Sequence, residues 1–232
     1  MNNIICIAGP TASGKTAIIA GGTGLYMDSL IRGNEFAPFP STGVREKLEK
    51  QADAEGLETM ISWLRSVDPE AAERCLDRKR ILRALEVYLE TGETITEHNR
   101  KTQAIPPKYS PLWLGLDCAD RAELYSRIDL RVDIMLQQGL LEEIKTLLAS
   151  GIPAKCTAMQ AIGYKEFVAA LAGESTIEDA AAEVKQSSRR YAKRQLTWFR
   201  RNKAMHWLIR QPGETSEEIL MKAQQILREF DN

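Results

Sequence analysis

Ile4-Ile5-Cys6-Ile7-Ala8 runs directly into Gly9-Pro10-Thr11-Ala12-Ser13-Gly14-Lys15-Thr16. The apolar run predicts a buried strand, and the second stretch fits the phosphate-binding P-loop pattern G-x-x-x-x-G-K-T. Its glycines let backbone N–H groups turn toward phosphate oxygens, its lysine supplies a cation and its threonine a hydroxyl for magnesium. A chance glycine-rich turn would fill fewer of these positions. We therefore predict a site for a diphosphate or a nucleotide at Gly9, Pro10, Thr11, Ala12, Ser13, Gly14, Lys15 and Thr16, with Thr16 as the Mg²⁺ ligand.

The composition is that of a globular protein with one or two domains. Of its 232 residues, 44% are hydrophobic and 27% are charged. No run approaches the ~18 apolar residues of a membrane span. Four scattered cysteines without a C-x-x-C pair predict reduced thiols rather than a zinc site. We expect a cytoplasmic protein, monomeric and without membrane contact.

The pattern along the chain predicts an α/β fold: a P-loop NTPase-like parallel sheet flanked by helices, with an inserted all-helical domain. Residues 1–34 and 106–232 contain the predicted strands and form the catalytic core. Residues 35–105 show only helical periodicity and form the insertion. Further along, Asp120 opens a long amphipathic helix that Gly139 divides, a second helix covers residues 176–188, and Met205–Arg210 is a final strand.

The connection after the P-loop is too short for this fold. Only four residues separate Thr16 from the pair Gly21-Gly22, and Ile18-Ile19-Ala20 itself predicts a second buried strand. A parallel crossover needs about a dozen residues or more. We therefore expect that a segment is absent between Thr16 and about Ile18, and reject a very short crossover.

A long stretch near the C-terminus carries cations without acids. Between Glu183 and Glu214 there is no acidic residue, and four aromatic residues lie among the basic ones. The nine cations are Lys185, Arg189, Arg190, Lys193, Arg194, Arg200, Arg201, Lys203 and Arg210. Such a stretch predicts contact with a phosphate backbone. A solvated helix face is the alternative, and for the aromatics we favour burial in the core.

Five motifs in this order resemble the tRNA dimethylallyltransferase family. They are GPTASGKT from Gly9, GGTGLY from Gly21, DRKRILRALE from Asp77, QAIGYKE from Gln160 and SRRYAKRQLTWFR from Ser188. The resemblance extends from the first strand to about Arg201. In that family the P-loop is followed by a helix and further elements before GGTGLY, and these are missing here. The resemblance places the general-base aspartate in that gap, so the sequence does not identify this residue.

The resemblance implies three sets of tRNA-contacting residues. The first is Lys79, Arg80, Ile81, Leu82 and Arg83, and the second is Gln160, Ala161, Ile162, Gly163, Tyr164 and Lys165. The third is Arg190, Lys193 and Arg194. From the residues alone, the first set is an ordinary surface helix and the second an ordinary turn before a helix.

Two further residues are candidates for the reacting centre. The resemblance places Thr23 beside the reacting amine and the diphosphate, whereas the residues alone allow it to be a helix cap. Arg127 and Arg131 share a helix face, and either can clamp a diphosphate or pair with Asp129 or Asp133. We favour Arg131.

The resemblance implies transfer of a dimethylallyl group from dimethylallyl diphosphate to the N6 amine of an adenosine beside a tRNA anticodon. Lys15, Thr23 and Arg131 are the predicted catalytic residues, and tRNA and dimethylallyl diphosphate are the partners. A small-molecule or nucleoside kinase using ATP is the alternative enzyme. A non-catalytic RNA-binding protein with a relict P-loop is the third hypothesis.

Overall fold

The computed structural model describes residues 3–8, 19–33, 42–75, 77–107 and 109–230. The chain divides into two compact units. The core unit comprises Met1–Asp28 and Tyr109–Asn232, and the helical unit comprises Ser29–Lys108. The two units are described separately below. The protein is a mixed α/β structure with parallel strands and many helices.

The core unit contains a parallel sheet in the order β2-β1-β3-β4. Its strands are β1 (Asn3–Ala8), β2 (Ile19–Gly21), β3 (Ser110–Cys118) and β4 (Met205–Arg210). Ala8 is the register partner of Gly21 on β2 and of Gly115 on β3. Because all neighbouring pairs are parallel, the carboxyl ends of the strands meet at one edge of the sheet.

Among its described residues, the core unit also contains six helices and one 3₁₀ turn, with α1 continuing into the helical unit. They are α1 (Gly24–Arg32), α7 (Arg121–Gln137), α8 (Leu140–Ala149), η1 (Ala158–Gln160), α9 (Lys165–Leu171), α10 (Ile177–Phe199) and α11 (Ser216–Phe230). The predicted break at Gly139 is confirmed: it has φ 94° and separates α7 from α8. The side chain of Asp120 caps α7 by accepting the N–H of Ala122.

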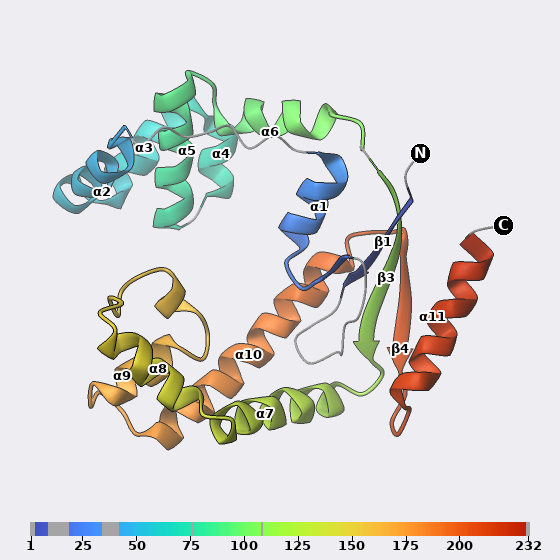
Figure 1. The fold of residues 1–232 in the computed structure, drawn as a ribbon. Helices are drawn as coiled ribbons and strands as arrows, with labels where there is room; N and C mark the ends of the chain where they lie inside the picture. The colour runs from blue at the N-terminus through green and yellow to red at the C-terminus, as the bar shows by residue number, and fades with distance from the viewer. Residues whose placement is uncertain (1–2, 9–18, 34–41, 76, 108, 231–232) are drawn as a thin grey trace. The chain divides into compact units, whose positions relative to one another are not determined.

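Apolar side chains fix α11 and α10 to the sheet and to α7. Along β3 and β4, α11 packs on Leu112, Leu114, Leu116 and Leu208 (Figure 1). Ala192 and Leu196 of α10 pack with Leu124 and Ile128 of α7. The predicted end of this helix at residue 188 is wrong: α10 continues to Phe199, because its buried stripe continues through Ala192, Leu196 and Phe199.

The helical unit contains α2 (Val44–Glu55), α3 (Leu57–Val67), α4 (Pro69–Arg74), α5 (Arg78–Thr91) and α6 (Ile95–Ala104). Their core includes Met60, Leu64, Ile81, Leu82 and Leu85. Asp68 caps α4 by accepting the Ala71 N–H at 3.0 Å, and its other oxygen accepts the Thr96 N–H at 3.0 Å. One buried carboxylate therefore joins the starts of two helices.

Candidate functional site: an arginine-lined pocket and a glycine-rich turn on α10

The predicted diphosphate residues 9–16, including Lys15 and Thr16, lie outside the described residues. The strand before them is described, and its last residue, Ala8, pairs with Gly21 and Gly115. The chain therefore leaves β1 at the edge where residues 22–24 follow β2. Ligands bind at this carboxyl edge in open parallel sheets.

Thr23 lies at the same edge, between β2 and α1. Its carbonyl oxygen accepts the N–H groups of Tyr26 at 3.1 Å and Met27 at 3.3 Å, so it directly precedes the first turn of α1. The residue is exposed. The amino end of a helix carries partial positive charge, which favours an anion beside Thr23.

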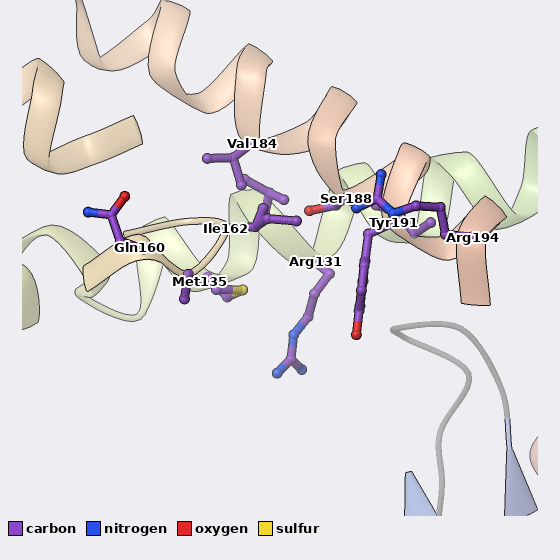
Figure 2. Close-up of a pocket in the computed structure, with 11 residues that line it drawn as sticks. Arg131, Met135, Gln160, Ile162, Val184, Ser188, Tyr191 and Arg194 are labelled. Atoms are coloured by element: carbon purple, nitrogen blue, oxygen red, sulfur yellow. The ribbon is translucent and has the colours of Figure 1, made fainter. Parts of the chain in front are cut away.

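A cavity of about 490 Å³ opens between α7, α10 and the loop after η1. Its lining residues are Ile128, Arg131, Val132, Met135, Gln160, Ala161, Ile162, Val184, Ser188, Tyr191 and Arg194. Figure 2 shows the side chains of Arg131 and Tyr191 extending in the same direction from neighbouring helices. Five predicted site residues, from three separate parts of the chain, thus line one cavity: Arg131, Gln160, Ala161, Ile162 and Arg194.

The cavity combines apolar walls with positive charge. No acidic side chain is among its lining residues, and the Arg194 guanidinium lies over the Tyr191 ring, 5.5 Å from its centroid. Asp129 and Asp133, which the sequence offered as partners for Arg131, instead pair with Arg189 and Lys185, at 2.6 Å each. A flat ligand or an anion suits this combination of guanidinium groups and an aromatic ring.

The cations around α10 fall into two groups. Lys185, Arg189, Arg200 and Arg210 form ion pairs with acidic residues of α7 or β3. Within the described residues, the others form no ion pair: Arg190, Lys193, Arg194, Arg201 and Lys203. All three predicted tRNA-contacting residues of α10 belong to the second group and are exposed.

The aromatic residues of this stretch also fall into two groups, one buried in the core and one partly exposed. Phe199 is buried, as predicted, and Trp207 packs against α7 and α10. Trp198 is 38% exposed, with the Arg201 guanidinium 5.5 Å from its ring centroid. Tyr191 is half-buried in the cavity wall. Burial in the core is therefore the wrong interpretation for Tyr191 and Trp198.

The segment 160–165 is held by internal hydrogen bonds. Gly163 has φ 94° and donates its N–H to the buried Glu166 carboxylate at 2.9 Å. The ammonium group of Lys165 lies 3.5 Å from the other Glu166 oxygen. The Tyr164 hydroxyl donates to Glu143 at 2.5 Å, and this bond raises the pKa of Tyr164. Because Glu143 engages this hydroxyl, Tyr164 would contact a base by stacking its ring and not by a hydrogen bond from the hydroxyl.

The basic segment of α5 is only partly available for binding. Lys79, Arg80 and Arg83 are exposed. Ile81 and Leu82 are 0% and 1% exposed, so the prediction that they contact tRNA is wrong for their side chains. The helical period turns these two residues into the core of the helical unit and leaves the cations outside.

A family model described as IPP transferase matches residues 4–202. The chain belongs to this family. A tRNA dimethylallyltransferase of Acetivibrio thermocellus is 38% identical over 222 residues, covering 94% of this chain and 71% of the relative. The tRNA dimethylallyltransferase 1 of Trichlorobacter lovleyi is 45% identical over 204 residues, covering 87% and 67%. The predicted family is thereby confirmed.

Solved structures of the IPP transferase family show the same fold. The full-length tRNA isopentenylpyrophosphate transferase of Bacillus halodurans matches with a TM-score of 0.58 and 33% identity, covering 92% of this chain and 66% of that one. The Staphylococcus epidermidis structure matches with a TM-score of 0.55 and 35% identity, covering 91% and 68%. The chain thus spans about two thirds of the length of these relatives.

Sequence reasoning overlooked two buried polar residues next to the predicted site residues. Gln195 is 6% exposed and donates from Nε2 to the Gly22 carbonyl at 2.8 Å. Glu166 is 4% exposed and holds the turn at Gly163. A polar residue on an apolar helical stripe was the available signal for both, because such a residue needs a partner when buried.

Proposed function

We propose that this chain transfers a dimethylallyl group from dimethylallyl diphosphate to the N6 amine of the adenosine beside the anticodon of a tRNA. tRNA dimethylallyltransferase is the activity of the family to which the chain belongs. One observation carries the residue-level proposal: Tyr191 and Arg194 of the cavity and Gln195 and Trp198 at the Thr23 turn share one flank of α10. Seven residues of helix span only about 10 Å.

The diphosphate of the substrate binds at the carboxyl edge of a P-loop NTPase-like sheet. Lys15 and the backbone of residues 9–16 bind the diphosphate, and Arg131 adds a second cation. The Thr16 hydroxyl would hold a Mg²⁺ ion, which would supply further positive charge against the leaving diphosphate. Stabilising charge as it develops on a leaving diphosphate is the largest expected catalytic contribution.

The acceptor base arrives from the cationic side of α10. The amine of adenine is a weak nucleophile, so it needs accurate placement against the allylic carbon. To reach the site, the base must leave its stack, and an aromatic ring beside a guanidinium group stabilises a base in that state. Tyr191 and Arg194 offer this pair. Gln160 donates from Nε2 to the Ala154 carbonyl at 3.3 Å, and we assign its amide to reading a base edge once that bond is exchanged. Exposed Thr23 then contacts the amine.

The helical unit grips the anticodon arm through Lys79, Arg80 and Arg83. The protein acts as a monomer in the cytoplasm, where its tRNA substrate is made. The general base is a carboxylate of the segment that we infer to be absent after Thr16, since residues 9–18 alone join the parallel strands β1 and β2. An intact mass above that of the 232 residues would show that the segment exists in the molecule.

The activity is tested by incubating the protein with labelled dimethylallyl diphosphate and bulk tRNA. We expect label in tRNA and, in a parallel reaction with ATP and nucleosides, no phosphoryl transfer. Lys15→Ala should abolish labelling and leave tRNA binding intact. Lys222→Ala on α11 is the matched control and should behave as wild type. Phosphorylated nucleosides, or equal loss of labelling and tRNA binding in Lys15→Ala, would contradict the assignment.

A further inference from the structure

The glycine-rich turn of residues 22–24 and the helix α1 that follows it each accept a hydrogen bond from α10. Gln195 Nε2 donates to the Gly22 carbonyl at 2.8 Å, and Trp198 Nε1 donates to an Asp28 oxygen at 3.2 Å. A Cβ added to Gly24 would lie 2.0 Å from two atoms of the Trp198 indole. The indole therefore packs directly on the backbone of the turn, and only glycine fits at position 24 beside it.

Gln195 occupies an unusual place for an amide. Its neighbours on the buried stripe of α10 are Ala192, Leu196 and Phe199. An apolar residue at position 195 would be buried without the desolvation cost of a polar group. A buried amide needs a hydrogen-bond partner, and among the described residues the Gly22 carbonyl provides one. The hydrogen bond thus selects one position of the turn relative to α10.

We propose that Gln195 and Trp198 are positioning residues that hold Thr23 at a fixed distance from the cavity. The proposal rests on the function proposed above for Thr23. Tyr191, Arg194, Gln195 and Trp198 have the spacing i, i+3, i+4, i+7, which places them on one helix flank. Helix α10 thus carries both a wall of the cavity and the hydrogen bond to the turn. Figure 1 shows α10 running toward the first turn of α1.

The variants remove the attachment and preserve packing. Gln195→Met keeps the length of the side chain and suits the apolar stripe, but it cannot donate to Gly22. Trp198→Phe keeps an aromatic ring near Gly24 and loses the N–H to Asp28. Gln186→Met, at an exposed position on the same helix, is the matched control. We expect kcat for dimethylallyl transfer to fall about tenfold in each of the first two, with KM for tRNA unchanged, because misplacement affects the chemical step.

Amide hydrogen exchange provides a readout that does not depend on turnover. The N–H groups of Tyr26 and Met27 bond to the Thr23 carbonyl, so they report on the order of the turn. Gln195→Met should speed their exchange about tenfold and leave β4 and α11 unchanged. Unchanged exchange at Tyr26 and Met27 would overturn the proposal, as would a raised KM for tRNA with wild-type kcat.

Thr23→Ala separates this proposal from the one it rests on. If Thr23→Ala lowers kcat and Gln195→Met alters neither kcat nor exchange, the positioning role is wrong and the function of Thr23 stands. If Thr23→Ala has wild-type kcat, the catalytic role of Thr23 is wrong. Faster exchange in Gln195→Met would then still show that Gln195 holds the turn.

Discussion

The division of the α10 cations predicts which of them bind RNA. Arg190, Lys193 and Arg194 are exposed and form no ion pair with the described residues. Each phosphate that such a cation neutralises contributes about 0.7 (single strand) to 0.9 (duplex) to the slope of log K against log salt concentration. Replacing all three by glutamine should therefore reduce that slope by about 2 to 3.

The control comes from the paired cations of the same helix. Lys185 and Arg189 lie 2.6 Å from Asp133 and Asp129, so their charges are already neutralised within the protein. Replacing these two by glutamine should reduce the slope by less than about 1. Fluorescence anisotropy of a labelled tRNA, titrated at several salt concentrations between about 50 and 200 mM, measures both slopes.

The comparison of the two variants is decisive because the paired and unpaired cations share one helix. If the Lys185 and Arg189 variant loses as much slope as the triple variant, ion pairing does not decide which cations bind RNA. If the triple variant keeps the wild-type slope, this face of α10 does not contact phosphate. Either result would refute the assignment of Arg190, Lys193 and Arg194.

Three further predictions follow from single contacts. Glu166→Ala removes the acceptor of the Gly163 N–H and should raise KM for tRNA several-fold with little change in kcat. Glu166→Gln keeps an acceptor and should raise KM by a smaller factor. An equal rise in KM for the two variants would contradict the role of this hydrogen bond. Ile81→Ala should lower the free energy of unfolding by about 2–5 kcal/mol in a denaturant titration and leave tRNA affinity unchanged in the folded protein. Tyr164 should ionise above pH 10.0 in an ultraviolet titration, because its hydrogen bond to Glu143 raises its pKa, and Glu143→Gln should lower it. The stability from that bond is present below pH 10.0 and lost as pH rises through the raised pKa.

Local signals in the sequence were sufficient for several helix boundaries. Asp120 was predicted to open a helix and accepts the Ala122 N–H at 2.8 Å. Asp68, which directly precedes Pro69, likewise accepts the Ala71 N–H at 3.0 Å at the start of α4. Gly92 ends α5 with φ 72°, and Gly139 separates two helices with φ 94°. These features depend on residues within one helical turn of each other, so the sequence alone contains the required information.

The rest depends on partners far apart in the chain. Arg189 and Arg190 are adjacent and chemically identical, yet only Arg189 meets an aspartate, sixty positions away on α7. Ile81 was assigned to RNA contact as part of a motif, whereas its place in the helical period directs it to the core. A motif identifies a segment of a binding surface, but periodicity decides which of its side chains reach the surface.

The ion pairs between α7 and α10 also explain why the cavity forms where it does. Asp129 pairs with Arg189 and Asp133 with Lys185, so residues four apart on one helix meet residues four apart on the other in reverse order. This is the register of two antiparallel helices. Each pair is partly exposed and contributes at most about 1 kcal/mol, so apolar packing holds the helices together and the pairs select the register. A slip of one turn would leave only one aspartate–cation pair, in a new combination, and would shift Arg131 by about 5.4 Å along the helix axis relative to Tyr191. The two aspartates of α7 thus pair with two of the nine cations of the basic stretch and set the register in which Arg131 and Arg194 line the same cavity.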